Sequence, residues 1–246
     1  MTDTPASSTE PQGAEPSAPA KKWQPLGSKE RRVLGVLLEK AKTTPDAYPM
    51  TLNAIRVGCN QKNNRYPLTN YEEEDVQDAL DHLRKLGAVA EVIGSGRAPK
   101  YRHYFYEWLG VDKVEAAAMA ELLLRGAQSE GDLRGRASRM EAIGDLTTMR
   151  NVLKSLKDKG LVIPITPEGR GHVIAHALYQ PQELEKVRTQ FAGGAMPPGD
   201  SGDEPAARSG GTSAAADLRH ELETLRAEVA ELRTELNALK EAMGAG

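Results

Sequence analysis

The chain has few of the residues that build disulfides, zinc sites or membrane spans. Its 246 residues include one cysteine, and aromatic residues make up only 4% of the sequence. The single Cys59 excludes a disulfide within the chain and leaves no cysteine cluster for zinc. No apolar run approaches the length that crosses a bilayer, and the polar N-terminus lacks the apolar core of a signal peptide. These absences favour a cytoplasmic protein with no membrane contact.

The chain also lacks a strong net charge. Its formal net charge at pH 7 is -3, which gives no general attraction to nucleic acid. The charges are unevenly distributed, because residues 27–110 hold 13 basic and 11 acidic side chains and residues 111–180 hold 10 and 9. The remaining residues hold 9 basic and 15 acidic side chains. Two weakly basic segments are therefore expected between acidic flanks.

Two stretches contain almost no large apolar side chains. Residues 1–25 and 191–216 are rich in Ala, Pro, Gly and Ser, and the mean hydropathy of the whole chain is -0.53. Such a composition cannot bury enough apolar surface to offset the conformational entropy lost on folding. We therefore predict a disordered tail at 1–25 and a disordered linker at 191–216.

Residues 26–110 show the order of three helices followed by a β-hairpin. A first helix is expected with Ser28 as its N-cap, a second is capped by Thr51, and a third ends at Gly87, which suits a left-handed position. The segment "AVAEVIGSGRAPKYRHYFYEW" then alternates apolar and polar residues on both sides of a Gly/Pro tip, which predicts a hairpin. This order is typical of a winged helix-turn-helix domain.

The same order repeats in residues 111–190. A shift of 73 residues superposes Val76 on Met149, Leu80 on Leu153, Leu83 on Leu156, Gly87 on Gly160 and Val89 on Val162. The segments of the second copy are "KVEAAAMAELLLRGA", "SEGDLRGRASRM", "DLTTMRNVLKSLKDKG" and the hairpin "LVIPITPEGRGHVIAHALY". The repeat supports the independent pattern of each copy and predicts two tandem domains.

Residues 217–243 carry a heptad repeat. Its apolar positions are spaced 4, 3, 4, 3, 4, 3, 4: Leu218, Leu222, Leu225, Val229, Leu232, Leu236, Leu239 and Met243. With Leu222 at an a position, glutamates occupy g and cations occupy e, so a parallel coiled coil pairs them between two chains. The alternative is an amphipathic helix that folds back on the domains. The predicted fold is α+β, mainly α, with two tandem winged helix-turn-helix domains followed by a flexible linker and a short C-terminal coiled coil, in a homodimer.

The second copy is the better candidate for contact with double-stranded DNA. In helix-turn-helix proteins the exposed face of the third helix enters the major groove, and the wing holds phosphates. Arg150, Lys154 and Lys157 form one stripe on this helix. The equivalent residues of the first copy are Gln77, Asp81 and Arg84, after an acidic run at 72–75. Further contacts are expected from basic residues of the second helix and both wings: Arg134, Arg136, Arg139, Arg170, Arg97, Lys100 and Arg102. The alternative is that these cations only solvate exposed helix faces.

The stretch "CNQKNNRYP", residues 59–67, joins the second and third helices of the first copy. Its polar residues either fold the loop onto the protein or meet phosphate: Asn60, Gln61, Lys62, Asn63, Asn64 and Arg65. Asn60 is expected in the left-handed conformation, and Thr69 with Glu72 is expected to form a capping box. The acidic run that follows favours the structural role. Cys59 is expected to be a small buried residue at a helix end.

The sequence contains no recognisable catalytic or metal-binding pattern. The glycines of "GSGRAP" lie at a hairpin tip, without the following helix that a phosphate-binding loop needs. His172 and His176 would share a strand face, but no cysteine or carboxylate at ligand spacing completes a metal set. No nucleophile is accompanied by a base and an orienting group. We therefore predict no enzyme activity, no cofactor and no metal.

Three motifs resemble the uncharacterised bacterial YceH-like family: "RRVLGVLLEKAKTTPDAYP", "CNQKNNRYP" and "LLLRGAQSEGDLRGRASRM". The resemblance spans residues 28–180 and extends to the C-terminal coiled coil. It implies a tandem winged-helix fold and brings no established activity, ligand or catalytic residue. The residue patterns favour a dimeric DNA-binding protein, a transcriptional regulator whose second domain is the main contact. The alternative is a scaffold that uses winged helices to bind a protein partner without DNA.

Overall fold

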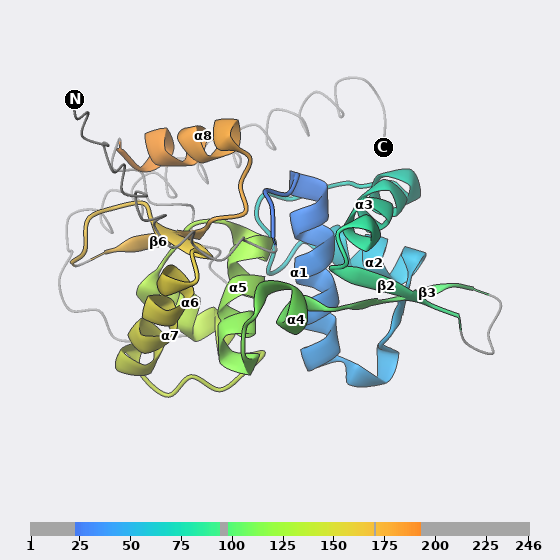
Figure 1. The fold of residues 1–246 in the computed structure, drawn as a ribbon, viewed down its shortest axis with the longest axis horizontal. Coiled ribbons are helices and arrows are strands. Elements are labelled where there is room, and N and C mark those ends of the chain that lie inside the picture. Colours follow the sequence, from blue (N-terminus) through green and yellow to red (C-terminus); the bar gives the residue numbers. More distant parts are fainter. Residues whose placement is uncertain (1–22, 94–97, 170, 193–246) are drawn as a thin grey trace, which may run out of the picture. The chain divides into compact units, whose positions relative to one another are not determined.

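The same order of elements occurs twice in the computed structural model (Figure 1). The structure describes residues 23–93, 98–169 and 171–192, which fall within one compact unit. The first half contains α1 (Ser28–Thr43), η1 (Pro45–Ala47), β1 (Met50–Thr51), α2 (Leu52–Cys59), α3 (Glu73–Lys85), β2 (Val89–Val92), β3 (Lys100–His103) and α4 (Phe105–Leu109). The second half contains α5 (Lys113–Arg125), β4 (Gln128–Ser129), α6 (Glu130–Ala137), α7 (Leu146–Asp158), β5 (Val162–Pro164), β6 (Val173–His176) and α8 (Pro181–Ala192). The described chain is therefore α+β and mainly helical.

Each half has a small antiparallel sheet with the same topology. The strand orders are β1-β3-β2 and β4-β6-β5. In the hairpins, Val89 lies opposite His103 and Val162 lies opposite His176. The antiparallel pairing predicted for both hairpins is confirmed among the described residues.

The length of one loop explains the shift between the two copies. The helices α2 and α6 differ by 78 positions, whereas α3 and α7 differ by 73. The loop from α2 to α3 covers residues 60–72 and the loop from α6 to α7 covers residues 138–145, which is five residues fewer. The first half therefore carries an insertion, and it lies in the segment that contains "CNQKNNRYP".

The end of the first hairpin differs from its sequence pattern. Strand β3 ends at His103 and α4 follows at once, although the alternation predicts a strand through Trp108. Phe105, Trp108 and Leu109 are buried at helical spacing, and α4 packs against α5. The burial of this helical face outweighs the local strand pattern, because strand preference depends strongly on tertiary context.

The caps of the helices follow local chemistry closely. Thr51 caps α2 as predicted, because its side-chain oxygen accepts a hydrogen bond from Ala54 N at 3.3 Å. The prediction for α1 is wrong by one residue, since Gly27 is the N-cap and its N–H donates to the carboxylate of Glu30. Gly87, with φ of 72°, follows the C-cap of α3 in the predicted left-handed conformation.

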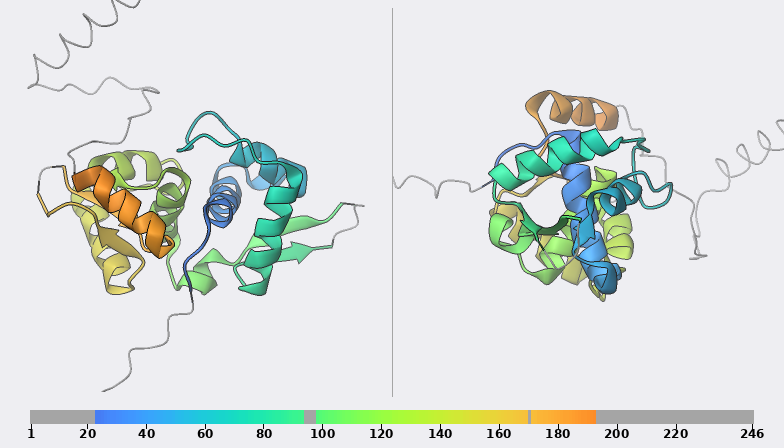
Figure 2. Two further views of the ribbon diagram at one scale, coloured as in Figure 1. Left: turned by 90° about the horizontal axis from the view of Figure 1, so that it is seen from above. Right: turned by 90° about the vertical axis from the view of Figure 1, so that its right-hand side faces the viewer.

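Helices α1 and α5 pack side by side and carry the core that both halves share (Figures 1 and 2). Gly35 permits their close approach, because a β-carbon at this position would lie 3.0 Å from Leu124 Cγ. The backbone N–H of Tyr66 also donates to the carbonyl of Leu124 at 3.0 Å. The predicted division between residues 110 and 111 falls between α4 and α5, and the apolar core crosses it.

Helix α8 covers the sheet of the second half. Its buried Phe191 packs with Ala127, Val173 and Ala175. The carboxylate of Glu183 also accepts two hydrogen bonds from the buried Arg31 of α1, at 2.7 and 3.0 Å. The helix therefore joins the second half to the first.

Some predictions lie outside the described residues. The coiled coil at 217–243, with its eight apolar positions, is one of them. The predicted linker is described only at residues 191 and 192, and the predicted tail only at residues 23–25. Arg97 and Arg170 also lie outside the described residues. Residues 191 and 192 belong to α8, and Trp23 packs against the core. Among the described helices, none combines the length and apolar character that crossing a bilayer requires.

Candidate functional site

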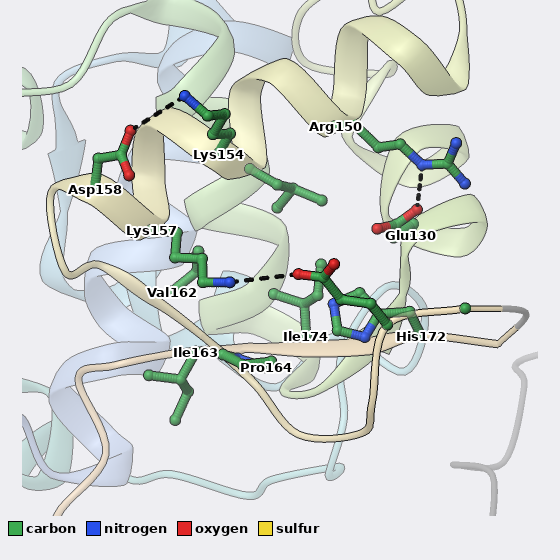
Figure 3. Close-up of a pocket in the computed structure, with 13 residues that line it drawn as sticks. Glu130, Arg150, Lys154, Lys157, Asp158, Val162, Ile163, Pro164, His172 and Ile174 are labelled. Carbon is green, nitrogen blue, oxygen red and sulfur yellow. Dashed lines mark hydrogen bonds and ion pairs between the residues drawn. The ribbon is translucent and has the colours of Figure 1, made fainter.

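The exposed face of α7 brings Arg150, Lys154 and Lys157 together (Figure 3). Their side chains are 60%, 80% and 55% exposed, respectively. The opposite face of the helix carries the buried Met149 and Leu156, because apolar and charged residues alternate at helical spacing. Three cations therefore line one accessible side of the third helix in the second half.

Each cation on α7 has a carboxylate beside it. Arg150 Nε lies 2.9 Å from Glu130 Oε2, Lys154 Nζ lies 3.8 Å from Asp158 Oδ2, and Lys157 Nζ lies 3.4 Å from Glu168 Oε1. The formal charge of these six side chains is zero. Glu130 comes from α6 and Glu168 from the loop between β5 and β6, so only the fold brings these two carboxylates to α7. Sequence patterns alone could not reveal this pairing.

A pocket of about 540 Å³ separates α7 from the second hairpin (Figure 3). Leu153, Val162 and Ile174 contribute buried apolar side chains to its lining. His172 lies at the hairpin side, where its Nδ1 is 3.2 Å from the carbonyl of Pro167. The three cations and their carboxylates surround an apolar floor.

Three arginines predicted to assist the α7 stripe have partners inside the protein. Arg136 Nη1 donates to Gln128 Oε1 at 2.7 Å, and Arg139 Nη2 donates to Glu121 Oε2 at 3.2 Å. Arg134 Nη1 lies 3.4 Å from the carbonyl oxygens that follow α6 at residues 143 and 144. These contacts give the three arginines a structural explanation, and their contact with DNA stays a prediction.

The predicted contacts of the first half are fewer. Lys100 and Arg102 are exposed on β3, and the guanidinium carbon of Arg102 lies 5.3 Å from the ring centre of Tyr104. On α3, Arg84 pairs with Asp81 at 3.2 Å and with Glu91 at 3.0 Å. Helix α3 therefore presents a single cation at the positions where α7 presents three.

The loop "CNQKNNRYP" is tied to the protein by Arg65, whose side chain is fully buried. Its two Nη atoms donate to the two carboxylate oxygens of Glu39 on α1, at 3.2 and 2.5 Å. Its Nε donates to the carbonyl of Gly58 at 2.9 Å, and Nη2 also donates to Gln61 Oε1 at 2.9 Å. A two-fold contact with a carboxylate is the strongest pairing that a guanidinium makes. These contacts give the loop a structural role.

Two asparagines of this loop, Asn60 and Asn64, also bind the protein itself, whereas Lys62 and Asn63 are exposed. Asn60 closes the loop, since its amide oxygen accepts from Tyr71 N at 2.8 Å and its amide nitrogen donates to Tyr71 O at 2.9 Å. Asn64 receives a hydrogen bond from Arg125 of α5 at 2.9 Å. Its φ of 60° makes Asn64 the left-handed residue, and the prediction for Asn60, with φ of -90°, is wrong. Asn60 instead uses its amide to hold the returning chain.

The predicted capping box of Thr69 and Glu72 is also wrong. Glu72 is itself the N-cap of α3, and its N–H donates to Asp75 Oδ2 at 3.0 Å. The hydroxyl of Thr69 donates instead to the carbonyl of Cys59 at 3.0 Å. The helix starts three residues later than expected, because Thr69 is used to close the loop onto the end of α2.

A second carboxylate, Glu121 of α5, is buried between the halves. Burial raises its pKa, whereas Arg139, Arg125 and Arg136 act to lower it. Arg139 Nη2 also lies 4.0 Å from Glu39, so the two buried carboxylates share a cationic environment. Sequence analysis missed this cluster, although Glu121 lies alone within the apolar stretch "AAAMAELLL", which was a signal of a buried charge.

The remaining chemically active side chains are buried or isolated. Cys59 is fully buried at the end of α2, as predicted, and burial raises its pKa to about 12. His176 is buried in β6 and stacks on Tyr179 with ring centres 3.9 Å apart, whereas His172 precedes the strand and is partly exposed. Only His176 therefore lies within the strand. Within the described ranges, His, Cys, Asp and Glu form no group of three or more that could hold a metal ion.

Comparisons with known proteins give a consistent result. A family model described as "Protein of unknown function, DUF480" matches residues 26–169. The chain is 53% identical to a UPF0502 protein of Rhodopirellula baltica over 178 residues, which cover 71% of this chain and 75% of the relative. It is 36% identical over 229 residues to a UPF0502 protein of Saccharophagus degradans, and the match covers 89% of this chain and 99% of the relative. It is also 36% identical over 224 residues to the UPF0502 protein YceH of Salmonella newport, and the match covers 89% of this chain and 98% of the relative.

Proposed function

The chain belongs to the DUF480 family of proteins of unknown function, and we propose that it binds double-stranded DNA through α7. The repeated order of elements supports the interpretation of each half as a winged helix-turn-helix domain, with α3 and α7 as third helices. The observation that carries the proposal is the line of Arg150, Lys154 and Lys157 on the exposed face of α7. An exposed helix of this kind fits the major groove, while a neighbouring hairpin reaches the phosphates.

The carboxylates beside these cations are compatible with DNA binding. Exposed ion pairs contribute about 0–1 kcal/mol each, so a phosphate can replace Asp158 or Glu168 with little loss. The neutral total charge of the six side chains predicts modest affinity. Because phosphate contacts release counterions, the affinity should fall steeply as salt rises.

A dimer would present two copies of α7 to one duplex. The heptad repeat at 217–243 supports a parallel coiled coil that couples two protomers. Two half-sites read by two equal modules are typical of dimeric helix-turn-helix regulators. We therefore propose a homodimeric transcriptional regulator.

Fluorescence anisotropy with labelled genomic fragments tests the proposal. Affinity is measured at 50, 100 and 200 mM salt, and we expect it to fall by at least tenfold over this range. The double variant Arg150→Glu, Lys154→Glu should abolish binding while the circular dichroism spectrum is retained, because both side chains are exposed. Absence of salt-dependent binding by the full chain would overturn the proposal.

The two halves provide a matched control. Lys157 of α7 and Arg84 of α3 occupy equivalent positions, and both are exposed cations. Lys157→Glu should weaken DNA binding at least tenfold, whereas Arg84→Glu, with the same change of charge, should leave it within about twofold. Equal effects of the two variants would mean that α7 is not the main contact.

A protein scaffold without DNA binding is the second candidate. The neutral charge of the α7 face and the apolar floor beside it favour this alternative. Affinity capture with and without nuclease separates the two functions. One dominant protein partner that survives nuclease, together with no salt-dependent DNA binding, would favour the scaffold.

A further inference from the structure

The pocket beside α7 has the size and lining of a small-molecule site. Its volume of about 540 Å³ lies within the range of about 300–1,000 Å³ that is common for ligand pockets. The buried Leu153, Val162 and Ile174 give it an apolar floor drawn from α7 and both strands of the hairpin. A floor of this kind favours a ligand with an apolar body.

The polar groups at the rim favour an anion. Lys154 and Lys157 lie three residues apart on α7, and both line the pocket (Figure 3). Their carboxylate partners are exposed and distant, at 3.8 Å for Asp158 and 3.4 Å for Glu168, so both pairs are weak. On the hairpin side of α7 a ligand anion can replace Glu168 and make a charge-assisted hydrogen bond to Lys157, while Lys154, on the other side of the helix, adds a weaker attraction.

The third ion pair of the rim is different. Arg150 Nε lies 2.9 Å from Glu130, whose side chain is only 16% exposed. The shorter distance and the lower exposure make this pair harder to replace than the two lysine pairs. Arg150 therefore stays with Glu130, and the anion-binding capacity of the pocket belongs to Lys154 and Lys157.

We propose that the pocket binds a small amphipathic carboxylate. Its anionic group binds Lys157 in place of Glu168, with Lys154 as a further attracting charge, and its apolar body covers Leu153, Val162 and Ile174. A medium-chain fatty acid has this chemistry. The proposal does not rest on DNA binding, because the ligand is bound by the free protein. If α7 also binds DNA, the ligand competes for the same two lysines.

Octanoate serves as the probe in a titration of the full chain with isotope-labelled isoleucine methyl groups. We expect saturable shifts of the Ile174 signals, which report the pocket, and none of Ile55, which is buried in the first half. Octylammonium, with the same apolar chain and the opposite charge, should bind at least tenfold more weakly. Absence of saturable octanoate shifts, or equal binding of both probes, would overturn the proposal.

Variants of the rim separate a charge-directed site from an apolar patch. Lys157→Gln should weaken octanoate binding about tenfold, because one charge-assisted hydrogen bond is lost. Glu168→Gln should strengthen it about twofold to fivefold, because a competing carboxylate is removed. Lys186→Gln, a control on α8 outside the pocket, should bind as the parent does. Unchanged affinity in both Lys157→Gln and Glu168→Gln would contradict the assigned site.

Discussion

Arg65 shows how the surroundings of a single polar residue decide whether its role is structural or functional. In the sequence it lies among amides and cations that suit either a turn or phosphate. In the structure its guanidinium has no exposed surface and binds Glu39, Gly58 and Gln61. A buried charge is stable only when it is paired and hydrogen-bonded. The residue that most distinguishes this loop therefore holds the fold together.

Replacement of Arg65 should be strongly destabilising. Arg65→Met leaves the buried carboxylate of Glu39 without its main partner, so we expect the free energy of unfolding to fall by about 3–5 kcal/mol. Arg188→Met, at an exposed arginine of α8, should change it by less than about 0.5 kcal/mol. Urea unfolding followed by circular dichroism measures both. A loss below about 1 kcal/mol for Arg65→Met would contradict the structural role.

A buried histidine links stability to pH. His103 is 8% exposed and surrounded by Tyr48, Phe105 and Tyr106, and its burial lowers its pKa from 6.5 to about 4. The folded state therefore keeps this side chain neutral, whereas the unfolded chain binds a proton below pH 6.5. Its contribution to stability is complete above pH 6.5 and is lost as the pH falls toward 4.

The size of this effect can be measured with a variant that keeps the local hydrogen bond. Asn at position 103 can still accept the hydrogen bond that Phe105 N donates to His103 Nδ1. Between pH 7 and pH 5 the parent should lose about 2 kcal/mol more stability than His103→Asn. Urea midpoints at the two pH values test this. Parallel losses in the two proteins would exclude His103 as the source.

At the scale of elements, two helices at equivalent positions of the repeat do not present the same charges on their exposed faces. Helices α3 and α7 have the same length and the same place in the repeat, yet only α7 carries three exposed cations. The buried positions of both helices agree, because Val76, Leu80 and Leu83 correspond to Met149, Leu153 and Leu156. Packing preserves one face of the helix, and the other face is free to differ.

The contact between α1 and α2 predicts the effect of a glycine replacement. A β-carbon at Gly58 would lie 2.7 Å from Cγ1 of Val36, whose branched side chain adapts poorly. Overpacking costs about 1–3 kcal/mol, and the gain in helix propensity offsets up to about 1 kcal/mol. Gly58→Ala should therefore lower the free energy of unfolding by about 1 kcal/mol.

Gly135 of α6 is the matched control for this replacement. An added β-carbon there has no neighbour within 4 Å, so Gly135→Ala should keep or raise the stability by up to about 1 kcal/mol. Urea midpoints of the two variants and the parent give the comparison. A Gly58→Ala variant as stable as the parent would show that Val36 can move aside.

At the scale of the whole molecule, the two halves of the repeat are not separate bodies. Helices α1 and α5 bury most of their surfaces against each other and their own halves. Leu26 N donates to Leu178 O at 2.9 Å, so the beginning of the first half joins the end of the second. If the orientation of the two halves is fixed, the positions of α7 and both hairpins relative to one another are fixed as well.

Self-association is predicted to depend on the C-terminal heptads. A chain that ends at residue 200 lacks the eight apolar heptad positions and should be a monomer, whereas the full chain should be a dimer. Sedimentation velocity measures this difference. A shortened chain that remains dimeric would place the interface elsewhere.

The orientation of the dimer can be tested by cross-linking. Gly246→Cys places a thiol just after the heptads, and oxidation should join the two chains only when the helices are parallel. The native Cys59 does not interfere, because it is buried and its pKa is raised to about 12. Failure of the cross-link in a chain shown to be dimeric would indicate antiparallel packing.

The sequence by itself determined the three helices of each copy, the two hairpins and the repeat among the described residues, but neither α4 nor α8. These features depend on local spacing, since apolar residues recur with the period of a helix or a strand and glycine marks a left-handed end. It also placed Arg150, Lys154 and Lys157 on one face of a helix. The same local spacing failed at α4 and at Thr69, where packing against distant residues outweighed it.

Only the tertiary structure decided which charges meet. Glu130 and Glu168 reach α7 from other elements, and Glu39 and Glu121 become buried partners of arginines far away in the chain. Such pairings depend on long-range packing, and one sequence carries no signal of which residues it brings within a few ångströms. The pocket beside α7 exists for the same reason, because its walls come from a helix and a hairpin that meet only in the fold.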